Sequence, residues 1–210
     1  TATAQAQGFF THEIIPVNIP QRKDDPIVVD TDEHPRASTT LEALAKLKPV
    51  VTAEGTVTAG NASGINDGAA AVLIASEQAI QQYQLKPRAK IIASTAVGVE
   101  PRIMGFAPAP AIKKLLKQAN LTIEQMYVIE LNEAFAAQAL AVTRDLGLAD
   151  DTTQVNPNGG AIAIGHPLGA SGARLVTTAL NQLEQTGGTY ALCSMCIGVG
   201  QGIAMIIQRV

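Results

Sequence analysis

The second half of the chain alternates between short apolar runs and stretches of helical periodicity. Pro110 opens a segment in which apolar residues recur at helical spacing, and an alanine-rich segment from Glu133 to Leu146 ends at Gly147, a residue type common at helix C-termini. A further helix is expected to end near Gln185. Runs of strand-forming residues predict strands at 91–99, 127–131, 190–197 and 203–209. This succession favours a layered α/β domain.

The first 63 residues are irregular and rich in Pro, Asp and Thr. They predict a short strand at 14–17. They also predict one helix, capped by Ser38 or Thr39 and stopped by Pro49, in which leucines recur at helical spacing.

A strand followed by a helix is predicted between residues 64 and 89. The apolar run 69–75 favours a strand, and Ser76 is expected to cap a helix that extends through Tyr83. Because nothing earlier in the chain supplies a sheet, we expect the partner strands to lie outside this sequence.

Composition agrees with a packed α/β protein. The chain has 210 residues, of which 47% are hydrophobic and only 3% aromatic, so it can bury a sizeable core of small side chains. The formal net charge of −3 argues against nucleic-acid binding, because no excess of cations is available to displace phosphate counterions. No apolar run reaches the about 20 residues that a membrane-spanning helix needs, so no membrane partner is expected.

The cysteines and the chain ends indicate a cytoplasmic location. Only Cys193 and Cys196 are present, close together, which does not suit a disulfide framework and favours a reducing compartment. The first seven residues lack the cationic start and apolar run of a signal peptide and read like the end of a helix. The last three residues are not a peroxisomal signal.

The sequence Asn132-Glu133-Ala134-Phe135 stands where a predicted strand passes into a predicted helix. Taken alone, an Asn at such a junction is most often a helix N-cap. The C-terminal ends of strands are also where α/β sheets place ligands, and an amide there can hold a catalytic water. Both interpretations stay open on these residues alone.

A glycine-rich stretch, 158–172, surrounds His166. Glycines let the backbone approach a ligand closely, and Pro167 suits the first turn of the following helix. A lone His is more often structural than catalytic, but one held between glycines ahead of a helix favours a functional role. The stretch is not a phosphate-binding P-loop, because no Gly-Lys-Ser/Thr sequence follows.

The motif at 193–202 contains both cysteines, followed by alternating glycines. A redox dithiol is disfavoured, because positions i and i+3 of a strand point to opposite faces. A zinc site lacks a second pair of ligands, and a dinucleotide fingerprint lacks the helix that should follow its glycines. The remaining interpretation is one functional thiol, Cys196, beside a glycine turn whose N–H groups can stabilise an oxyanion.

Taken together and in this order, the motifs resemble the thiolase family along essentially the whole chain. The matching segments are 32–36, 55–64, 132–135, 158–167 and 196–198. Within the family, residues 99–110 and 190–202 are most similar to the 3-oxoadipyl-CoA (β-ketoadipyl-CoA) thiolases of aromatic-compound degradation. The resemblance implies an acyltransferase that cleaves 3-oxoadipyl-CoA with coenzyme A into succinyl-CoA and acetyl-CoA.

The resemblance also implies catalytic roles for four matching positions. His166 would activate a nucleophilic cysteine and, with a water held by Asn132, stabilise the enolate oxygen of the thioester. Cys196 would be the general acid/base at the acetyl carbon, and the N–H of Gly198 would donate to a second oxyanion hole. The chemistry needs such donors, each worth roughly 10²–10³ in rate, and a base like Cys with a pKa of about 8.5.

Coenzyme A is implied as a substrate, with no permanently bound cofactor and no metal ion. Arg36 would approach its nucleotide end and Ser63 its pantetheine, while Met104, Ala134 and Phe135 would line the acyl and pantetheine slot. The alternatives without a binding role are that Arg36 is a solvated surface charge and that Met104 only fills space in the core.

The family architecture implies an α/β/α domain with a mixed five-stranded sheet, plus remnants of two other units. Residues 1–63 would end a loop domain, 64–89 would be the last unit of an N-terminal domain, and 90–210 would form the C-terminal domain. The family's acylated cysteine lies in a segment without counterpart here. We therefore expect a fragment, inactive by itself, that works with the missing N-terminal half in a homodimer or homotetramer.

Three alternatives stay open. The first is a generic acetoacetyl-CoA or fatty 3-oxoacyl-CoA thiolase, which would differ only in the acyl chain of its substrate. A dicarboxylic acyl chain would need a cation to bind its distal carboxylate, and the sequence does not show which Arg or Lys would supply it. A non-catalytic acyl-CoA-binding module on the same fold predicts that His166 and Cys196 can be replaced without loss of turnover. A nicotinamide oxidoreductase requires a helix after Gly202, where the sequence predicts a strand.

Overall fold

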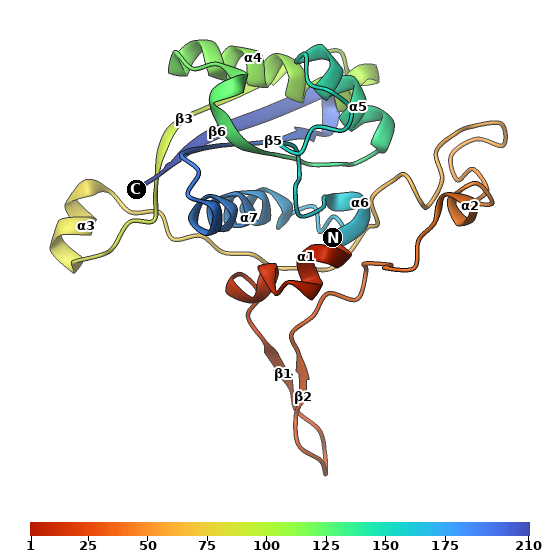
Figure 1. Ribbon diagram of the computed structural model, residues 1–210, viewed down its shortest axis with the longest axis horizontal. Coiled ribbons are helices and arrows are strands. Elements are labelled where there is room, and N and C mark those ends of the chain that lie inside the picture. Colours follow the sequence, from red (N-terminus) through yellow and green to blue (C-terminus); the bar gives the residue numbers. More distant parts are fainter.

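A computed structural model describes residues 1–210, and its regular part is a sheet with helices on both faces (Figure 1). The sheet has four strands in the order β3-β6-β5-β4. β4 and β5 run parallel, whereas β6 is antiparallel to both of its neighbours. The strands are β3 (Ala89–Gly98), β4 (Met126–Leu131), β5 (Tyr190–Ile197) and β6 (Gln201–Arg209).

Three helices make the outer layers. α4 (Pro108–Ala119) packs on the sheet with α5 (Ala136–Asp145) beside it, and α7 (Ser171–Thr186) covers the opposite face (Figure 1). The α/β/α layering predicted from the sequence is therefore confirmed. None of the helices is both long and apolar enough to cross a membrane.

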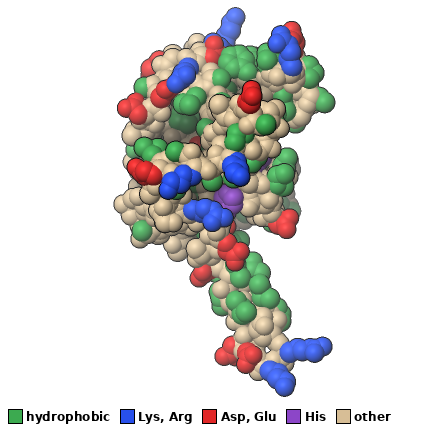
Figure 2. Space-filling view, turned by 90° about the vertical axis from the view of Figure 1, so that its right-hand side faces the viewer, with side chains coloured by type: hydrophobic (Ala, Val, Ile, Leu, Met, Phe, Trp, Pro, Cys, Tyr) green, Lys and Arg blue, Asp and Glu red, His purple; other side chains and the backbone are tan.

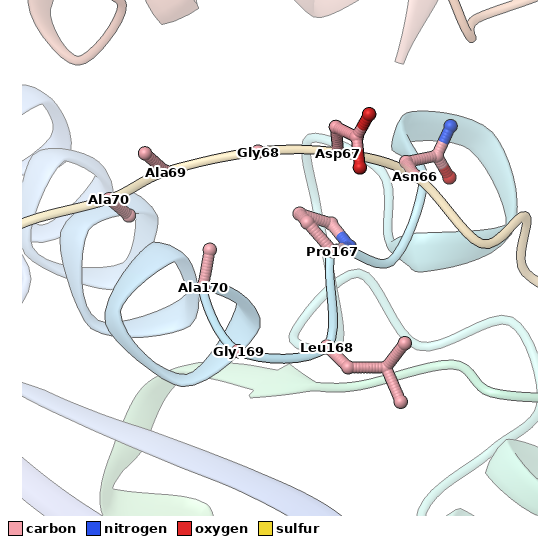
Figure 3. A pocket seen from close by; sticks show the side chains of 9 residues that line it. All are labelled: Asn66, Asp67, Gly68, Ala69, Ala70, Pro167, Leu168, Gly169 and Ala170. Carbon is pink, nitrogen blue, oxygen red and sulfur yellow. The ribbon is translucent and has the colours of Figure 1, made fainter.

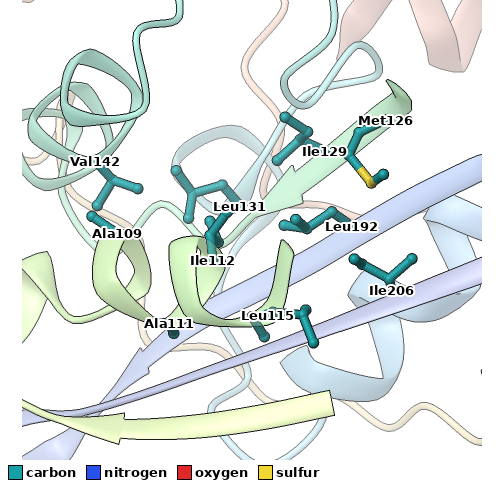
Figure 4. Close-up of a cluster of buried hydrophobic side chains, with 11 residues drawn as sticks. Ala109, Ala111, Ile112, Leu115, Met126, Ile129, Leu131, Val142, Leu192 and Ile206 are labelled. Atoms are coloured by element: carbon teal, nitrogen blue, oxygen red, sulfur yellow. The ribbon is translucent and has the colours of Figure 1, made fainter. Parts of the chain in front are cut away.

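Strands β4, β5 and β6 are largely buried because the two faces of the sheet pack on separate clusters, whereas no residue of β3 is fully buried. Ile129 and Leu131 of β4 face α4, where they join Ile112 and Leu115 in an eleven-residue cluster (Figure 4). Val128, which precedes Ile129 in the strand, faces α7 with six other buried residues. Burial on both faces explains why the strands read as nearly continuous apolar runs in the sequence.

A fifth strand exists only in rudimentary form. Val155 makes an isolated parallel bridge to Ile129, at the free edge of β4. The N–H of Ile129 donates to Gln154 at 2.8 Å, and the N–H of Asn156 donates to Ile129 at 2.9 Å. Asn156 has φ of 45° and Pro157 follows it, so the extended backbone stops there. The expected five-stranded sheet is thus four strands and one bridge.

The N-terminal segment packs against the body through α1 (Ala2–Ala6) and the 3₁₀ turn η1 (Phe9–His12). Ala4, Phe9 and Phe10 form a small buried cluster, with Ile164 of the short helix α6 (Ala161–Ile164) against it. The remaining short elements are α2 (Leu41–Leu44), α3 (Glu77–Tyr83), and the 3₁₀ turns η2 (Pro101–Phe106), η3 (Ile123–Gln125) and η4 (Gly198–Gly200).

A two-stranded antiparallel hairpin, β1 (Val17–Ile19) and β2 (Ile27–Val29), projects from the body (Figures 1 and 2). Figure 2 shows apolar side chains along this arm and charged ones at its tip. All six paired residues are exposed. Such a hairpin is marginally stable by itself in water.

Two predicted elements of the first half shift and one is absent. The strand expected at 14–17 begins at Val17. The helix expected to run to Pro49 ends at Leu44, and it is capped by Thr40, whose hydroxyl accepts from the Ala43 N–H at 3.1 Å. The run 69–75 forms no strand, and Leu73 is 85% exposed, because no strand of this chain lies beside it to pair. α3 is confirmed, with the Ser76 hydroxyl accepting from Ala79 at 3.1 Å.

Three helix starts differ from the prediction. α4 begins at Pro108, because Pro is also tolerated at the first helical positions there. α5 begins at Ala136 with Phe135 as its N-cap, so Asn132 is not a helix cap. α7 begins at Ser171, which leaves Pro167 in the preceding turn and not in the first turn of the helix.

Candidate active site

His166 lies in the loop between α6 and α7, and its ring is held by the first residue of α7. The Nδ1 atom is 2.6 Å from the Ser171 hydroxyl, which itself donates to the carbonyl of Pro167 at 3.1 Å. A serine hydroxyl has one hydrogen to donate. Because that hydrogen goes to Pro167, Nδ1 of His166 donates to Ser171 and Nε2 keeps its lone pair.

Asn132 follows β4 directly and meets the other side of the same ring. Its Nδ2 lies 3.3 Å from Nε2 of His166, and its backbone N–H donates to Ser194 of β5 at 3.0 Å. The side chain is 1% exposed, and its Oδ1 is buried without a hydrogen-bond partner. The structure therefore brings together an amide and an imidazole that are 34 positions apart.

The surroundings of His166 keep the imidazole neutral. Burial lowers the pKa of His166 below its ordinary value, and the positive charge of Arg174 lowers it further. A neutral ring with a bare Nε2 is the form that accepts a proton.

Arg174 belongs to a buried ion pair that the sequence analysis missed. Its Nη1 donates to Oε2 of Glu130 on β4 at 3.0 Å, and Glu130 is fully buried. Burial raises the pKa of Glu130 to about 7, although Arg174 opposes the shift. Glu13 lies nearby and accepts hydrogen bonds from α7, and burial raises its pKa as well. A carboxylate inside an otherwise apolar predicted strand was the signal available in the sequence.

Ser171 was also missed as a functional residue. Its place two residues after Gly169 in a small-residue run gives no hint that it contacts His166. Together with Asn132, it fixes both ring nitrogens of His166.

Cys196 is near the end of β5, where it pairs with Gly202 of β6. The Asn132 N–H binds Ser194, so Cys196 lies two residues further along the same strand. The side chain is 7% exposed, and burial raises the pKa of its thiol, with a backbone hydrogen bond acting in the opposite direction. A thiol with a raised pKa stays protonated at neutral pH and can serve as an acid.

Cys193 differs from Cys196 in its surroundings and in how far its pKa is raised. It packs among the apolar residues under α7, and burial raises the pKa of its thiol far above the ordinary value. Both cysteines are free. The prediction that the two do not form a dithiol agrees with this arrangement.

Gly198 opens the tight turn η4 that joins β5 to β6. Val199 next to it has φ of 60°, a conformation that is strained for a β-branched residue. The turn is tied to the chain before η2, because the Val99 N–H donates to Gly200 at 2.7 Å. The structure places Gly198 two residues beyond Cys196 on an exposed edge.

Three of the predicted coenzyme-binding residues, Ser63, Ala134 and Phe135, lie in two segments joined by backbone contacts, and no such contact joins Arg36 or Met104 to them. The Ser63 N–H donates to Ala134 at 3.0 Å, and Ala62 bridges Phe135. Arg36 is exposed and takes part in no ion pair. Met104 is half-buried in η2. No cluster of three or more His, Cys, Asp and Glu residues has the arrangement of a metal site.

The comparisons with known proteins define the class. Residues 85–209 match the family described as thiolase, C-terminal domain, and residues 1–78 match the thiolase N-terminal domain. The chain belongs to the thiolase family.

Individual relatives show which thiolases the chain is similar to. The chain is 83% identical over 210 residues to a β-ketoadipyl-CoA thiolase of Acinetobacter baylyi, covering 100% of this chain and 52% of that protein. The acetyl-CoA acetyltransferase of Bacillus anthracis has a TM-score of 0.94 and 42% identity, and human mitochondrial 3-ketoacyl-CoA thiolase in complex with CoA has 0.90 and 47%. Both structures match the whole chain over 52% and 51% of their own lengths, so the chain spans about half of each relative.

Proposed function

We propose that this chain carries the acid/base half of a thiolase that cleaves 3-oxoadipyl-CoA with coenzyme A into succinyl-CoA and acetyl-CoA. The observation that carries the proposal is the position of His166, whose two ring nitrogens are held by Asn132 and Ser171. The identity of 83% to a β-ketoadipyl-CoA thiolase supports the choice of acyl group.

In the first half of the reaction, a nucleophilic cysteine from the other half of the family's length gives its proton to Nε2 of His166. Its thiolate adds to the 3-oxo carbon, the C2–C3 bond breaks, and the electron pair of that bond forms the enolate of acetyl-CoA. The protonated Nε2 and a water held by Asn132 donate to the enolate oxygen. Cys196 then protonates C2 and releases acetyl-CoA. The unpartnered Oδ1 of Asn132 supports its role in holding the water.

In the second half, the Cys196 thiolate takes the proton of the incoming coenzyme A thiol. The new thiolate attacks the succinyl thioester, and the N–H of Gly198 donates to the oxyanion that forms. The enzyme sulfur leaves with the bonding electrons and recovers the proton from His166. Both histidine and cysteine end in their starting protonation states.

Coenzyme A is proposed to lie along the segment that contains Ser63, which contacts Ala134. The CoA complex of the human mitochondrial 3-ketoacyl-CoA thiolase supports a coenzyme site in this fold. Arg36 is proposed for the nucleotide end, and Met104 and Phe135 for the acyl slot. Assembly as a homodimer or homotetramer stays a prediction.

The test is thiolysis by the full-length protein. We expect 3-oxoadipyl-CoA to be cleaved with higher kcat/KM than acetoacetyl-CoA, and His166→Ala and Cys196→Ser to lose at least about 100-fold in kcat. Cys193→Ser is the matched control, because this thiol faces the opposite side of β5 and should leave kcat nearly unchanged. Full turnover in the His166 and Cys196 variants would show that neither residue is catalytic, and it would favour the alternative in which this fold is an acyl-CoA-binding module.

A further inference from the structure

One short segment, 61–66, connects the two loops that carry Asn132 and His166. On one side Ala62 bridges Phe135, and the Ala136 N–H donates to Asn61 at 2.8 Å. On the other side Ile65 bridges His166, whose N–H lies 3.2 Å from the carbonyl of Gly64. The segment is thus hydrogen-bonded to both halves of the candidate site.

The side chain of Asn66 makes two contacts at the end of this segment. Its Oδ1 accepts from the backbone N–H of His166 at 3.2 Å, and its Nδ2 lies 3.3 Å from Nδ1 of His34. Figure 3 shows the stretch from Asn66 to Ala70 passing over the turn that begins at Pro167. Because the amide of Asn66 donates to Nδ1, His34 carries its proton on Nε2.

Two glycines make the room that the Asn66 amide occupies. A Cβ at Gly165 would lie 2.5 Å from Oδ1 of Asn66, and the φ of 101° at Gly165 disfavours any side chain there. A Cβ at Gly64 would lie 2.8 Å from the same oxygen and 2.6 Å from the His34 ring. The amide is therefore enclosed by backbone on the side of His166 and by an imidazole on the other.

We propose that Asn66 is a positioning residue that couples the coenzyme-binding segment to His166. The proposal rests on the proposed function, in which Ser63 and Arg36 bind coenzyme A. Ser63 lies three residues before Asn66, and Arg36 lies two residues after its partner His34. An atom of His166 displaced by about 1 Å can cost roughly 100-fold in rate, so a small shift of this backbone has a measurable effect.

The consequence is a split between kcat and KM. Loss of the Asn66 contacts moves the His166 ring without removing a group that touches coenzyme A. We expect kcat to fall while KM for coenzyme A changes little. Replacement of Ser63 by Ala, in contrast, is expected to raise KM for coenzyme A.

The experiment uses the full-length enzyme, with wild-type thiolysis measured first. Asn66→Leu removes both contacts at similar volume, and we expect a 10- to 100-fold loss of kcat, in keeping with about 1 Å of misplacement. Asn66→Asp keeps an acceptor for the His166 N–H, and its second oxygen can accept from His34 in the other tautomer, so it should recover most of the activity. Asp67→Asn is the control, because Asp67 is exposed and makes no hydrogen bond with its side chain.

Each outcome of the experiment supports or overturns the proposed role of Asn66. Equal kcat in Asn66→Leu and Asp67→Asn overturns the proposal, and so does an Asn66→Asp variant as impaired as Asn66→Leu. If Asn66→Leu does not fold, Asn66→Ala takes its place and must show the same loss of kcat. If neither variant folds, the amide serves stability alone and the proposal is overturned. An inactive wild-type enzyme would overturn the proposed function instead, so the two failures are distinguishable.

Discussion

Residues 89–210 and residues 1–88 contrast in how they bury apolar side chains. In the first 88 residues the only buried hydrophobic side chains are Ala4, Phe9 and Phe10, whereas the rest of the core lies in the C-terminal part. Exposed large apolar side chains, in contrast, are more frequent in the N-terminal part, where Ile65 is 90% and Leu73 is 85% exposed. The C-terminal part therefore has a core of its own, and the N-terminal part is held by contacts to α6, to α7 and to the loops of the candidate site.

The C-terminal part also has an open, mostly apolar pocket of about 570 Å³. It lies beside α7 and is lined by Leu175 and Val176 of that helix and by Met195 and Met205 of the sheet. The candidate chemistry sits on the part with its own core, while the proposed coenzyme segment belongs to the part without one. The comparison predicts that substitutions will affect the two parts unequally.

The largest expected effect is in the buried ion pair of the C-terminal part. Arg174→Met leaves Glu130 buried without a counter-charge, which costs about 3–5 kcal/mol in the free energy of unfolding. Urea unfolding of the chain above pH 7, where Glu130 of the folded wild type is ionised, measures the loss. Lys113→Met, which breaks an exposed pair with Asp145, is the control and should cost less than about 1 kcal/mol. Similar losses in the two variants would contradict the burial argument.

A pair of apolar truncations tests the comparison directly. Leu192 is fully buried in the cluster under α4, so Leu192→Ala should cost about 2–5 kcal/mol. Val28 in the projecting hairpin is 54% exposed, and Val28→Ala should stay within about 0.5 kcal/mol. If the hairpin variant were as destabilised as the core variant, the hairpin would have a structural role that its exposure in this chain does not reveal.

Glu130 gives the stability a pH dependence. Its pKa is raised from 4.5 to about 7 in the folded chain, so between these values the folded state binds more protons than the unfolded state. Stability therefore falls as pH rises from about 4.5 to about 7, by up to about 1.4 kcal/mol per pH unit. Glu130→Gln should remove this slope, and comparison with the wild type cancels the contribution of His166. Unfolding at pH 5 and pH 7 provides the measurement, and an unchanged slope would be the contrary result.

The smallest effect is expected at the turn after β5. Val199 has φ of 60°, and Val199→Gly relieves strain of about 1–3 kcal/mol, partly offset by the entropy of glycine in the unfolded chain. We expect a gain of about 1 kcal/mol in stability. A loss of stability would show that the exposed valine makes contacts that offset the strain.

The sequence predicted the strands of the C-terminal part well because each is a bounded apolar run. β4, β5 and β6 differ from their predicted limits by at most two residues, and β3 begins two residues early. The run 69–75 has the same composition but forms no strand, because a strand also requires a neighbour, and composition does not report one.

The candidate site divides in the same way. His166, Asn132 and Cys196 could be named because each stands in a local motif with a chemical reading. Ser171, Asn66 and the pair of Glu130 with Arg174 could not, since their partners lie 5 to 100 positions away and no local pattern marks the contact. The pair follows from the packing of α7 on β4 and the Asn66 contact from the segment that crosses the His166 loop, and both are visible only in three dimensions.

The parallel pairing of β4 and β5 has a consequence for how this chain can change. Both strands leave the sheet at one edge, so Asn132 and the end of β5 are fixed by the register of two neighbours. The exposed turn at 149–151, which precedes the bridge at Val155, can then lengthen or shorten without shifting either group. An insertion in that surface loop should be tolerated, whereas one extra residue inside β5 would turn Cys196 to the other side of the sheet.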